Sequence, residues 1–347
     1  MRRGIFAFVL AMLMPAAALG ATDRAKPLFA GDDVIRVTIK GPVAAVARTG
    51  GTPSAPRPAS LSVAGAHPEM LAISLSPRGL TRRKPGVCSF SPLRVEFTDK
   101  PPQESLFSGQ KKLKLVTHCQ GSAGYQQYVL LEYAAYRLYN AITPLSLRVR
   151  LATIDYAAED GRVLTTRLGF FIEDTDDAAR RNGMREAKVG DSVGLGQLGA
   201  RDAARFALFE YMISNLDWSM RGGPAGEGCC HNAKLIAAQS AATGLIPIPY
   251  DFDFSGLVDP PSAVPPDGFA EQSVRERRYR GYCVHNAAAQ AAATEFIARQ
   301  GALKAVLNGI PQLDAHYRGK ASAFLDSFFA QIASDKGLGK MFKTCVG

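Results

Sequence analysis

The sequence lacks the features that would assign it to the membrane, nucleic-acid-binding or zinc-binding classes. Beyond the N-terminus, none of its 347 residues belong to an apolar run long enough to span a membrane. No predicted helix carries a continuous basic stripe and no known nucleic-acid-binding module is present. We therefore expect no integral membrane segment in the mature chain and no nucleic-acid partner. No CxxC pair occurs, and His231 and His285 lack ligand-like spacing to the cysteines near them, which argues against zinc.

The first twenty residues have the pattern of a secretory signal peptide. Arg2 and Arg3 precede an apolar run over residues 4–18, and the small residues Ala18 and Gly20 suit a cleavage site. The run is short for a membrane span, although an uncleaved N-terminal anchor is the alternative. We expect an exported protein, located in the periplasm or outside the cell.

Six cysteines in an exported chain favour disulfide bonds. Adjacent cysteines rarely suit one another as partners, so we expect the neighbouring pair to bond elsewhere. The expected pairing is Cys88 with Cys119, and Cys229 and Cys230 with Cys283 and Cys345.

The chain is basic, with a net charge of +10, and two short stretches, 78–84 and 275–280, are dense in arginine and lysine. Short basic clusters suit phosphate-sized ligands better than a polymer, and a solvated basic surface is the alternative.

Hydrophobic periodicity divides the chain into a strand-rich half, 21–174, and a mostly helical half, 175–347, which predicts an α+β fold. The expected strands of the first half are 34–40, 70–75, 93–97, 112–116, 146–156 and 162–172, with one helix over 125–142 and a loop over 49–58. The second half is expected to contain helices over 202–216, 285–307 and 322–332, and short strands over 233–237 and 245–249. Asp202 is the expected N-cap of the first of these helices.

Two segments place aspartates inside otherwise apolar sequence, where a carboxylate is costly unless it is paired or binds a metal. NLDWSM contains Asp217, and YDFDFSG contains Asp251 and Asp253 two residues apart. Between them, Asn232 begins a predicted strand. If the second segment is extended, both of its aspartates lie on one side and its phenylalanines face the core. Carboxylate and carboxamide oxygens suit Mg²⁺ or Mn²⁺, and phosphoryl transfer requires such a set.

The order of these motifs resembles that of the spore-coat CotH kinase family, secreted relatives of the atypical protein kinases. Five pieces are similar: RGLTR at 78–82, the helix LEYAAYRLYNAIT at 131–143, the strand and acidic residue GFFIE at 169–173, the Asp217 segment followed by Asn232, and the DFD of 251–253. The resemblance implies a two-lobed protein-kinase-like fold, with a strand-rich N-lobe that contains one long helix and a mostly helical C-lobe.

The resemblance also implies roles for individual residues. Asp217 would be the catalytic base, Asn232 with Asp251 or Asp253 would bind Mg²⁺ or Mn²⁺, and Arg78 with Gly79 would contact the phosphates of ATP or another nucleotide. The family's phosphate-binding lysine is replaced on the matching strand by Arg94, while Lys114 lies further on. Either could be the nucleotide-binding cation, and Glu132 is its candidate partner on the helix. The function implied is transfer of phosphate to a protein or small-molecule hydroxyl acceptor.

Two other classes of function remain open. The same scaffold could be a catalytically inactive binding or envelope-assembly module. The same carboxylates could also support metal-dependent hydrolysis of a phosphoester, with water as the nucleophile.

Overall fold

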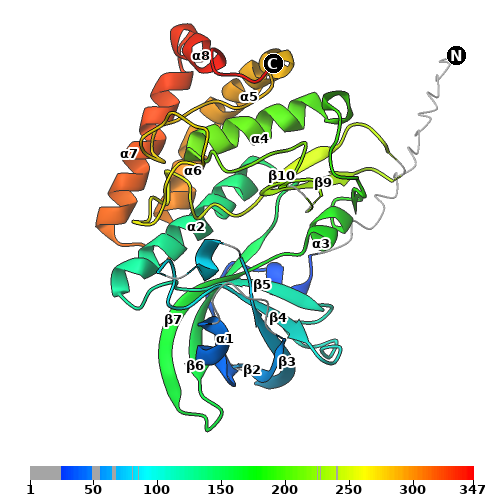
Figure 1. Ribbon diagram of the computed structural model, residues 1–347, viewed down its shortest axis with the longest axis vertical. Coiled ribbons are helices and arrows are strands. Elements are labelled where there is room, and N and C mark those ends of the chain that lie inside the picture. Colours follow the sequence, from blue (N-terminus) through cyan, green and yellow to red (C-terminus); the bar gives the residue numbers. More distant parts are fainter. Residues whose placement is uncertain are drawn as a thin grey trace, which may run out of the picture.

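The structure is a computed structural model that describes residues 25–48, 55–64, 68–79, 81–84, 86–224, 226, 228–239 and 241–347. The predicted signal peptide, 1–20, lies outside the described residues. Figure 1 shows the strands of the first half gathered at the bottom of the molecule and most helices stacked at the top, with helix α2 between them.

Seven strands of the first half form a closed barrel in the order β1-β2-β3-β4-β5-β7-β6. They are β1 (Ile35–Lys40), β2 (Arg57–Val63), β3 (Glu69–Pro77), β4 (Leu93–Phe97), β5 (Lys112–Val116), β6 (Val149–Ala157) and β7 (Val163–Ile172). Alternate side chains fill the barrel interior: in β1, Ile35, Val37 and Ile39 are buried while the residues between them face outward.

The prediction of a two-lobed protein-kinase-like fold is wrong, because the sheet closes on itself. β1 pairs in parallel with β6, with Ile35 opposite Ala152 and Lys40 opposite Ala157, whereas every other pair in the barrel is antiparallel. This single parallel pair joins the two edges that an open N-lobe sheet would leave free. Pairing between strands so far apart in the sequence cannot be read from periodicity, which reports only local alternation.

Helix α1 (Val43–Ala47) packs against the barrel strands, and the other elements form a helical layer and a small sheet. The other helices are α2 (Ala123–Ile142), α3 (Thr175–Arg180), α4 (Ala200–Ile213), α5 (Asn286–Ala298), α6 (Gln300–Asn308), α7 (Ala315–Ile332) and α8 (Asp335–Phe342). The sheet has the order β10-β9-β8, with β8 (Arg185–Glu186), β9 (Ala233–Ala237) and β10 (Ile246–Pro249). A large apolar core joins α2, α4, the small sheet and the C-terminal helices.

Helix α2 connects the barrel to the helical layer. Its residues 129–136 are buried without exception, and they pack on β6 and β7 on one side and on α6 on the other. A helix that is buried on all sides must satisfy any charge it carries. Glu132, which is 2% exposed, is such a charge, and its partner is described below.

Local predictions agree with the structure best where one element follows one period. The strands expected over 93–97, 112–116 and 233–237 are confirmed to the residue as β4, β5 and β9. β2 begins at Arg57, so the loop expected over 49–58 is wrong at its last two residues, and 49–54 lie outside the described residues. The strand is not predicted, because its sequence contains Pro58 and follows a segment rich in glycine, proline and serine. The helix expected over 285–307 is two helices, α5 and α6, which meet at Arg299.

The N-cap prediction for the helix before Asp217 is also wrong. Gly199 is the N-cap of α4, and Asp202 lies within its first turn, where its carboxylate is bound by Arg205 at 2.6 Å. The helix ends at Ser214, whose left-handed backbone (φ 54°) terminates it. Asp217 therefore lies four residues beyond Ile213, the last residue of the helix, rather than at its end.

Three cysteine pairs lie at disulfide distance, and one agrees with the predicted pairing. Cys88 faces Cys119 with Cα atoms 4.6 Å apart, as expected. Cys283 pairs with Cys345 at 5.1 Å, and the neighbours Cys229 and Cys230 pair with each other. The expectation that the neighbours would bond to residues 283 and 345 is wrong. In the described part of the chain, no helix has both the length and the apolar character needed to cross a membrane.

Candidate functional site

A large polar cleft lies between one side of the barrel and the small sheet with its following loop. It contains about 1920 Å³ of empty space, open solvent included. Eight of the nine residues singled out from the sequence line it: Arg78, Gly79, Arg94, Lys114, Asp217, Asn232, Asp251 and Asp253. The ninth, Glu132, lies behind the cleft wall on α2. The structure therefore brings together residues from segments up to 175 positions apart, while their roles stay predictions.

The backbone around Asp217 is fixed by side chains on both sides. The Asp217 amide donates to Oδ1 of Asn215 at 3.0 Å, and the Trp218 indole donates to the Asn215 carbonyl at 3.0 Å. From the second basic cluster, Arg280 donates to the carbonyls of Leu216 and Trp218 at 2.5 and 2.8 Å. Arg280 also lies over the Trp218 ring at 4.7 Å. Arg280 therefore fixes the backbone on both sides of Asp217.

The Asp217 carboxylate is half-exposed and contacts two neighbouring residues. His231 Nε2 lies 2.7 Å from Oδ1, and Asn232 Nδ2 donates to the Asp217 carbonyl at 2.7 Å and to Oδ2 at 3.2 Å. Asn232 has a left-handed backbone (φ 47°), which asparagine tolerates better than most residues. These contacts orient the Asp217 carboxylate, and they use only Nδ2 of Asn232, so its Oδ1 is available to a ligand.

The DFD segment follows β10 and is held against Asn232 by strand pairing. Ala233 of β9 lies opposite Pro249 of β10, and the Tyr250 amide donates to the Asn232 carbonyl at 3.2 Å. Asp251 has a left-handed backbone (φ 67°), and its amide donates to the Tyr136 hydroxyl at 3.0 Å. Among the described residues, none forms a hydrogen bond or an ion pair with the Asp251 carboxylate.

The predicted extended form of this segment is therefore wrong. The left-handed residue breaks the alternation, and the chain turns at residues 253 and 254. Phe252 faces the core as expected and is fully buried, but Phe254 is half-buried and lines the cleft. Both aspartates still reach the cleft, by a turn rather than by strand periodicity.

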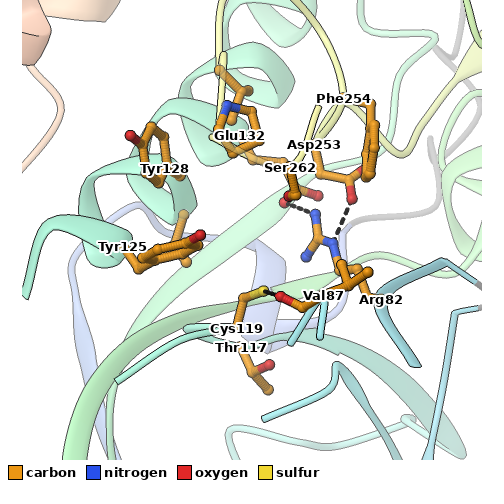
Figure 2. Close-up of a pocket in the computed structure, with 13 residues that line it drawn as sticks. Arg82, Val87, Thr117, Cys119, Tyr125, Tyr128, Glu132, Asp253, Phe254 and Ser262 are labelled. Carbon is orange, nitrogen blue, oxygen red and sulfur yellow. Dashed lines mark hydrogen bonds and ion pairs between the residues drawn. The ribbon is translucent and has the colours of Figure 1, made fainter. Parts of the chain in front are cut away.

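Arg82 binds the second aspartate of this segment and Glu132 together. Its Nε donates to Asp253 Oδ2 at 2.5 Å and its Nη2 to Glu132 Oε2 at 2.6 Å, as Figure 2 shows. Burial alone would lower the pKa of Arg82, but the charges of Asp253 and Glu132 raise it above its usual value. Burial raises the pKa of Glu132 to about 7 and also raises the pKa of Asp253, while the positive charge of Arg82 opposes both shifts.

The cations of the cleft come from the barrel. The Lys114 ammonium lies 4.5 Å from the centre of the Tyr250 ring, and burial, with the charges of Arg78 and Lys234, lowers its pKa to about 8. The side chain of Arg78 forms no ion pair with any described residue. Arg94 is 49% exposed and lies 3.7 Å from Glu96. Burial thus disfavours the charged form of Lys114, and a bound anion would oppose this effect.

The sequence-based pairing of Glu132 with a nucleotide-binding cation differs from what the structure contains. Glu132 binds Arg82, and neither Lys114 nor Arg94 is its partner. Arg82 lies within the RGLTR motif, but the resemblance gives it no role. Buried carboxylates need a cation, so the apolar sequence around Asp253 and Glu132 was the available indication that an arginine would bind them.

His231, Tyr136 and Arg280 were also missed as contributors to the site. His231 had been considered only as a zinc ligand, although it directly precedes Asn232. Tyr136 lies one turn after Glu132 on α2, a spacing that places both on one helix face. Arg280 had no local pattern that could reveal its contact with residues more than sixty positions away.

The donor set fits a divalent cation in its chemistry. The described residues contain no preformed group of three histidine, cysteine or acidic ligands. Asp251 and Oδ1 of Asn232 are nevertheless hard oxygen donors on one hairpin, and Mg²⁺ is commonly held by one or two protein oxygens together with substrate phosphates. Asp253 is less available, because its carboxylate already binds Arg82.

No model of a protein family matches the chain, and no curated protein matches it. The likeness to the CotH family therefore rests on the short motifs quoted above.

Proposed function

We propose that the polar cleft binds a nucleoside triphosphate with Mg²⁺ or Mn²⁺ and transfers its terminal phosphoryl group to a hydroxyl acceptor. The observation that carries the proposal is the division of the cleft. Cations from the barrel form one wall, and Asp217, Asn232 and the DFD segment form the other. A phosphate chain with a bound cation is complementary to both walls at once.

On the barrel wall, Lys114 and Arg78 would bind the phosphates. The Arg78 side chain forms no ion pair with any described residue, and a phosphate would favour the protonated form of Lys114. The exposed Arg94 would contribute a weaker, screened attraction. Gly79, with φ 80° and open space around it, lets the loop pass close to the ligand.

On the opposite wall, Asn232 and Asp251 would hold the metal ion, with Asp253 a further ligand if Arg82 releases it. The metal would supply a positive charge that stabilises the phosphates during transfer. The unpartnered carboxylate makes Asp251 the principal ligand of the two aspartates.

Asp217 would be the base. The acceptor oxygen forms a bond to the terminal phosphorus, the bond from that phosphorus to the bridging oxygen breaks, and the hydroxyl proton passes to Asp217. His231 and Asn232 hold the Asp217 carboxylate in one orientation for this step. The acceptor is a protein or a small molecule, and we propose no nucleic-acid partner.

We further propose that the protein is exported and related to the CotH family in its chemistry. Three cysteine pairs at disulfide distance support an oxidising compartment such as the periplasm or the extracellular space. The quoted motifs support the relation, and the barrel shows that it does not extend to a kinase-like fold.

One observation favours a second candidate, a binding module without catalytic activity. Arg82 binds one oxygen of Asp253 and one of Glu132, so it competes with a metal for Asp253 and with Lys114 for Glu132. A protein that had lost catalysis could keep this network for stability alone.

Terminally labelled ATP with Mn²⁺ separates these functions. The proposal predicts label on an acceptor or on the protein itself, and loss of that label in Asp217→Asn. Release of free phosphate with no labelled acceptor would indicate hydrolysis instead. ATP binding without turnover in the presence of a broad set of hydroxyl acceptors would favour the binding module.

A further inference from the structure

A second, narrower pocket lies on the α2 side of the Arg82 network. It contains about 400 Å³ of empty space, open solvent included. In Figure 2, Arg82 lies at its centre, with Tyr125 and Tyr128 of α2 on one side and Phe254 on the other. The wall is mostly apolar, and its members include Val87, Tyr125, Tyr128, Val129, Phe254 and Val258.

A buried carboxylate oxygen in this pocket has no partner among the described residues. Glu132 Oε2 accepts from Arg82, but Glu132 Oε1 is buried and accepts no hydrogen bond from any described residue. Glu132 as a whole is 2% exposed. An unpaired buried carboxylate oxygen is expensive, and water would satisfy it poorly, because a buried water needs about two to four polar partners and this wall offers few.

The charges at the base of the pocket are unbalanced. Arg82 contributes one positive charge, while Glu132 and Asp253, when both are ionised, contribute two negative charges. The pocket therefore combines a narrow apolar entrance with a base that carries one excess negative charge. The complementary ligand has an unbranched apolar stem and a positively charged donor at its end.

We propose that this pocket binds a primary alkylammonium group, presented by a free aliphatic amine or by a lysine side chain. The ammonium group would donate to Glu132 Oε1 while the alkyl chain packs against Val129 and Phe254. The excess negative charge would repel an anion, and a neutral alcohol would leave that charge uncompensated. The proposal requires no nucleotide, so it stands or falls separately from the proposed phosphoryl transfer.

The test is a ligand-observed NMR titration of the full oxidised chain at pH 8, above the pKa of Glu132. The probes are n-butylamine, Nα-acetyl-lysine amide with its side-chain ammonium free and, as the neutral isostere, n-butanol. Butylamine should bind at least about tenfold more tightly than butanol, the usual scale of one charged hydrogen bond. Binding of butylamine alone would identify a free amine as the ligand, and equal or tighter binding of the lysine derivative would identify a lysine side chain.

Two matched variants locate the site without touching the buried network. Ser262 lines the pocket, and Ala263, its neighbour in the same loop, does not. Ser262→Trp should abolish amine binding, and Ala263→Trp should retain it. Glu132→Gln should remove the preference for the amine over the alcohol. Equal affinities for amine and alcohol in the wild type, or full amine binding in Ser262→Trp, would overturn the proposal.

Discussion

Replacement of Arg82 by methionine is the most informative test of the buried network. The substitution removes the cation that Asp253 and Glu132 share, and these two side chains are 16% and 2% exposed. Breaking one buried ion pair costs about 3–5 kcal/mol. Because Arg82 makes two such contacts, we expect Arg82→Met to lower the free energy of unfolding by about 4 kcal/mol or more at pH 8.

The loss should depend on pH in a defined direction. Without Arg82, the pKa values of both carboxyls rise further in the folded state, so the folded protein binds protons that the unfolded chain releases. Stability is then present at low pH and is lost as pH rises, by up to about 1.4 kcal/mol per carboxyl for each pH unit. The destabilisation of Arg82→Met should therefore be smaller at pH 5 than at pH 8.

Urea denaturation at the two pH values measures both effects. Arg57→Met, at an exposed position on β2, is the control and should change stability by less than about 0.5 kcal/mol. The double variant Arg82→Met/Glu132→Gln should recover about 1–2 kcal/mol, because one uncompensated charge has been removed. A loss below about 1 kcal/mol for Arg82→Met, or one that does not change with pH, would refute the reasoning.

Three further predictions concern single side chains. The pKa of Lys114 is lowered to about 8, so the affinity of the wild-type protein for Mg·ATP, measured by calorimetry, should fall between pH 7 and pH 9. The Lys114→Arg variant should keep its affinity at pH 9, and the same pH dependence in both proteins would contradict this prediction. Burial lowers the pKa of His118 to about 4, so the neutral side chain contributes about 3 kcal/mol of stability above pH 6.5, and this contribution is lost as the pH falls toward 4. Acid denaturation of His118→Phe should lack this pH-dependent loss, and an acid transition identical to that of the wild type would contradict the prediction. Arg280→Met should slow phosphoryl transfer by about tenfold to a hundredfold while nucleotide affinity stays the same, because Arg280 holds the backbone beside Asp217; an equal loss of affinity would assign it a general structural role.

The sequence was sufficient for elements that follow one local period. Alternation over five residues located β4 and β5, because each buries one face against the same barrel interior. It could not show that β1 pairs in parallel with β6, since that contact depends on the path of the whole chain. The kinase-like prediction failed at this pair.

The candidate site was predictable in its members and less so in its geometry. Carboxylates in apolar sequence identified Asp217, Asp251 and Asp253, because buried charge is rare without a purpose. Strand periodicity gave the wrong backbone for the last two, because the left-handed turn at Asp251 has no marker such as glycine. Partners distant in sequence, such as Arg82 for Glu132, required the fold.

The central claim is that the cleft holds a metal–nucleotide complex, and an electron paramagnetic resonance titration of Mn²⁺ tests it directly. With ATP present, the wild-type chain should lower free Mn²⁺ below the level that the same concentration of ATP gives alone, and Asp251→Asn should weaken this additional binding by about tenfold, since one charged ligand is lost. Asp99→Asn, at an exposed turn, should bind as the wild type does. The same free Mn²⁺ concentration with ATP alone and with ATP plus the wild-type protein, or identical binding in Asp251→Asn, would contradict the claim.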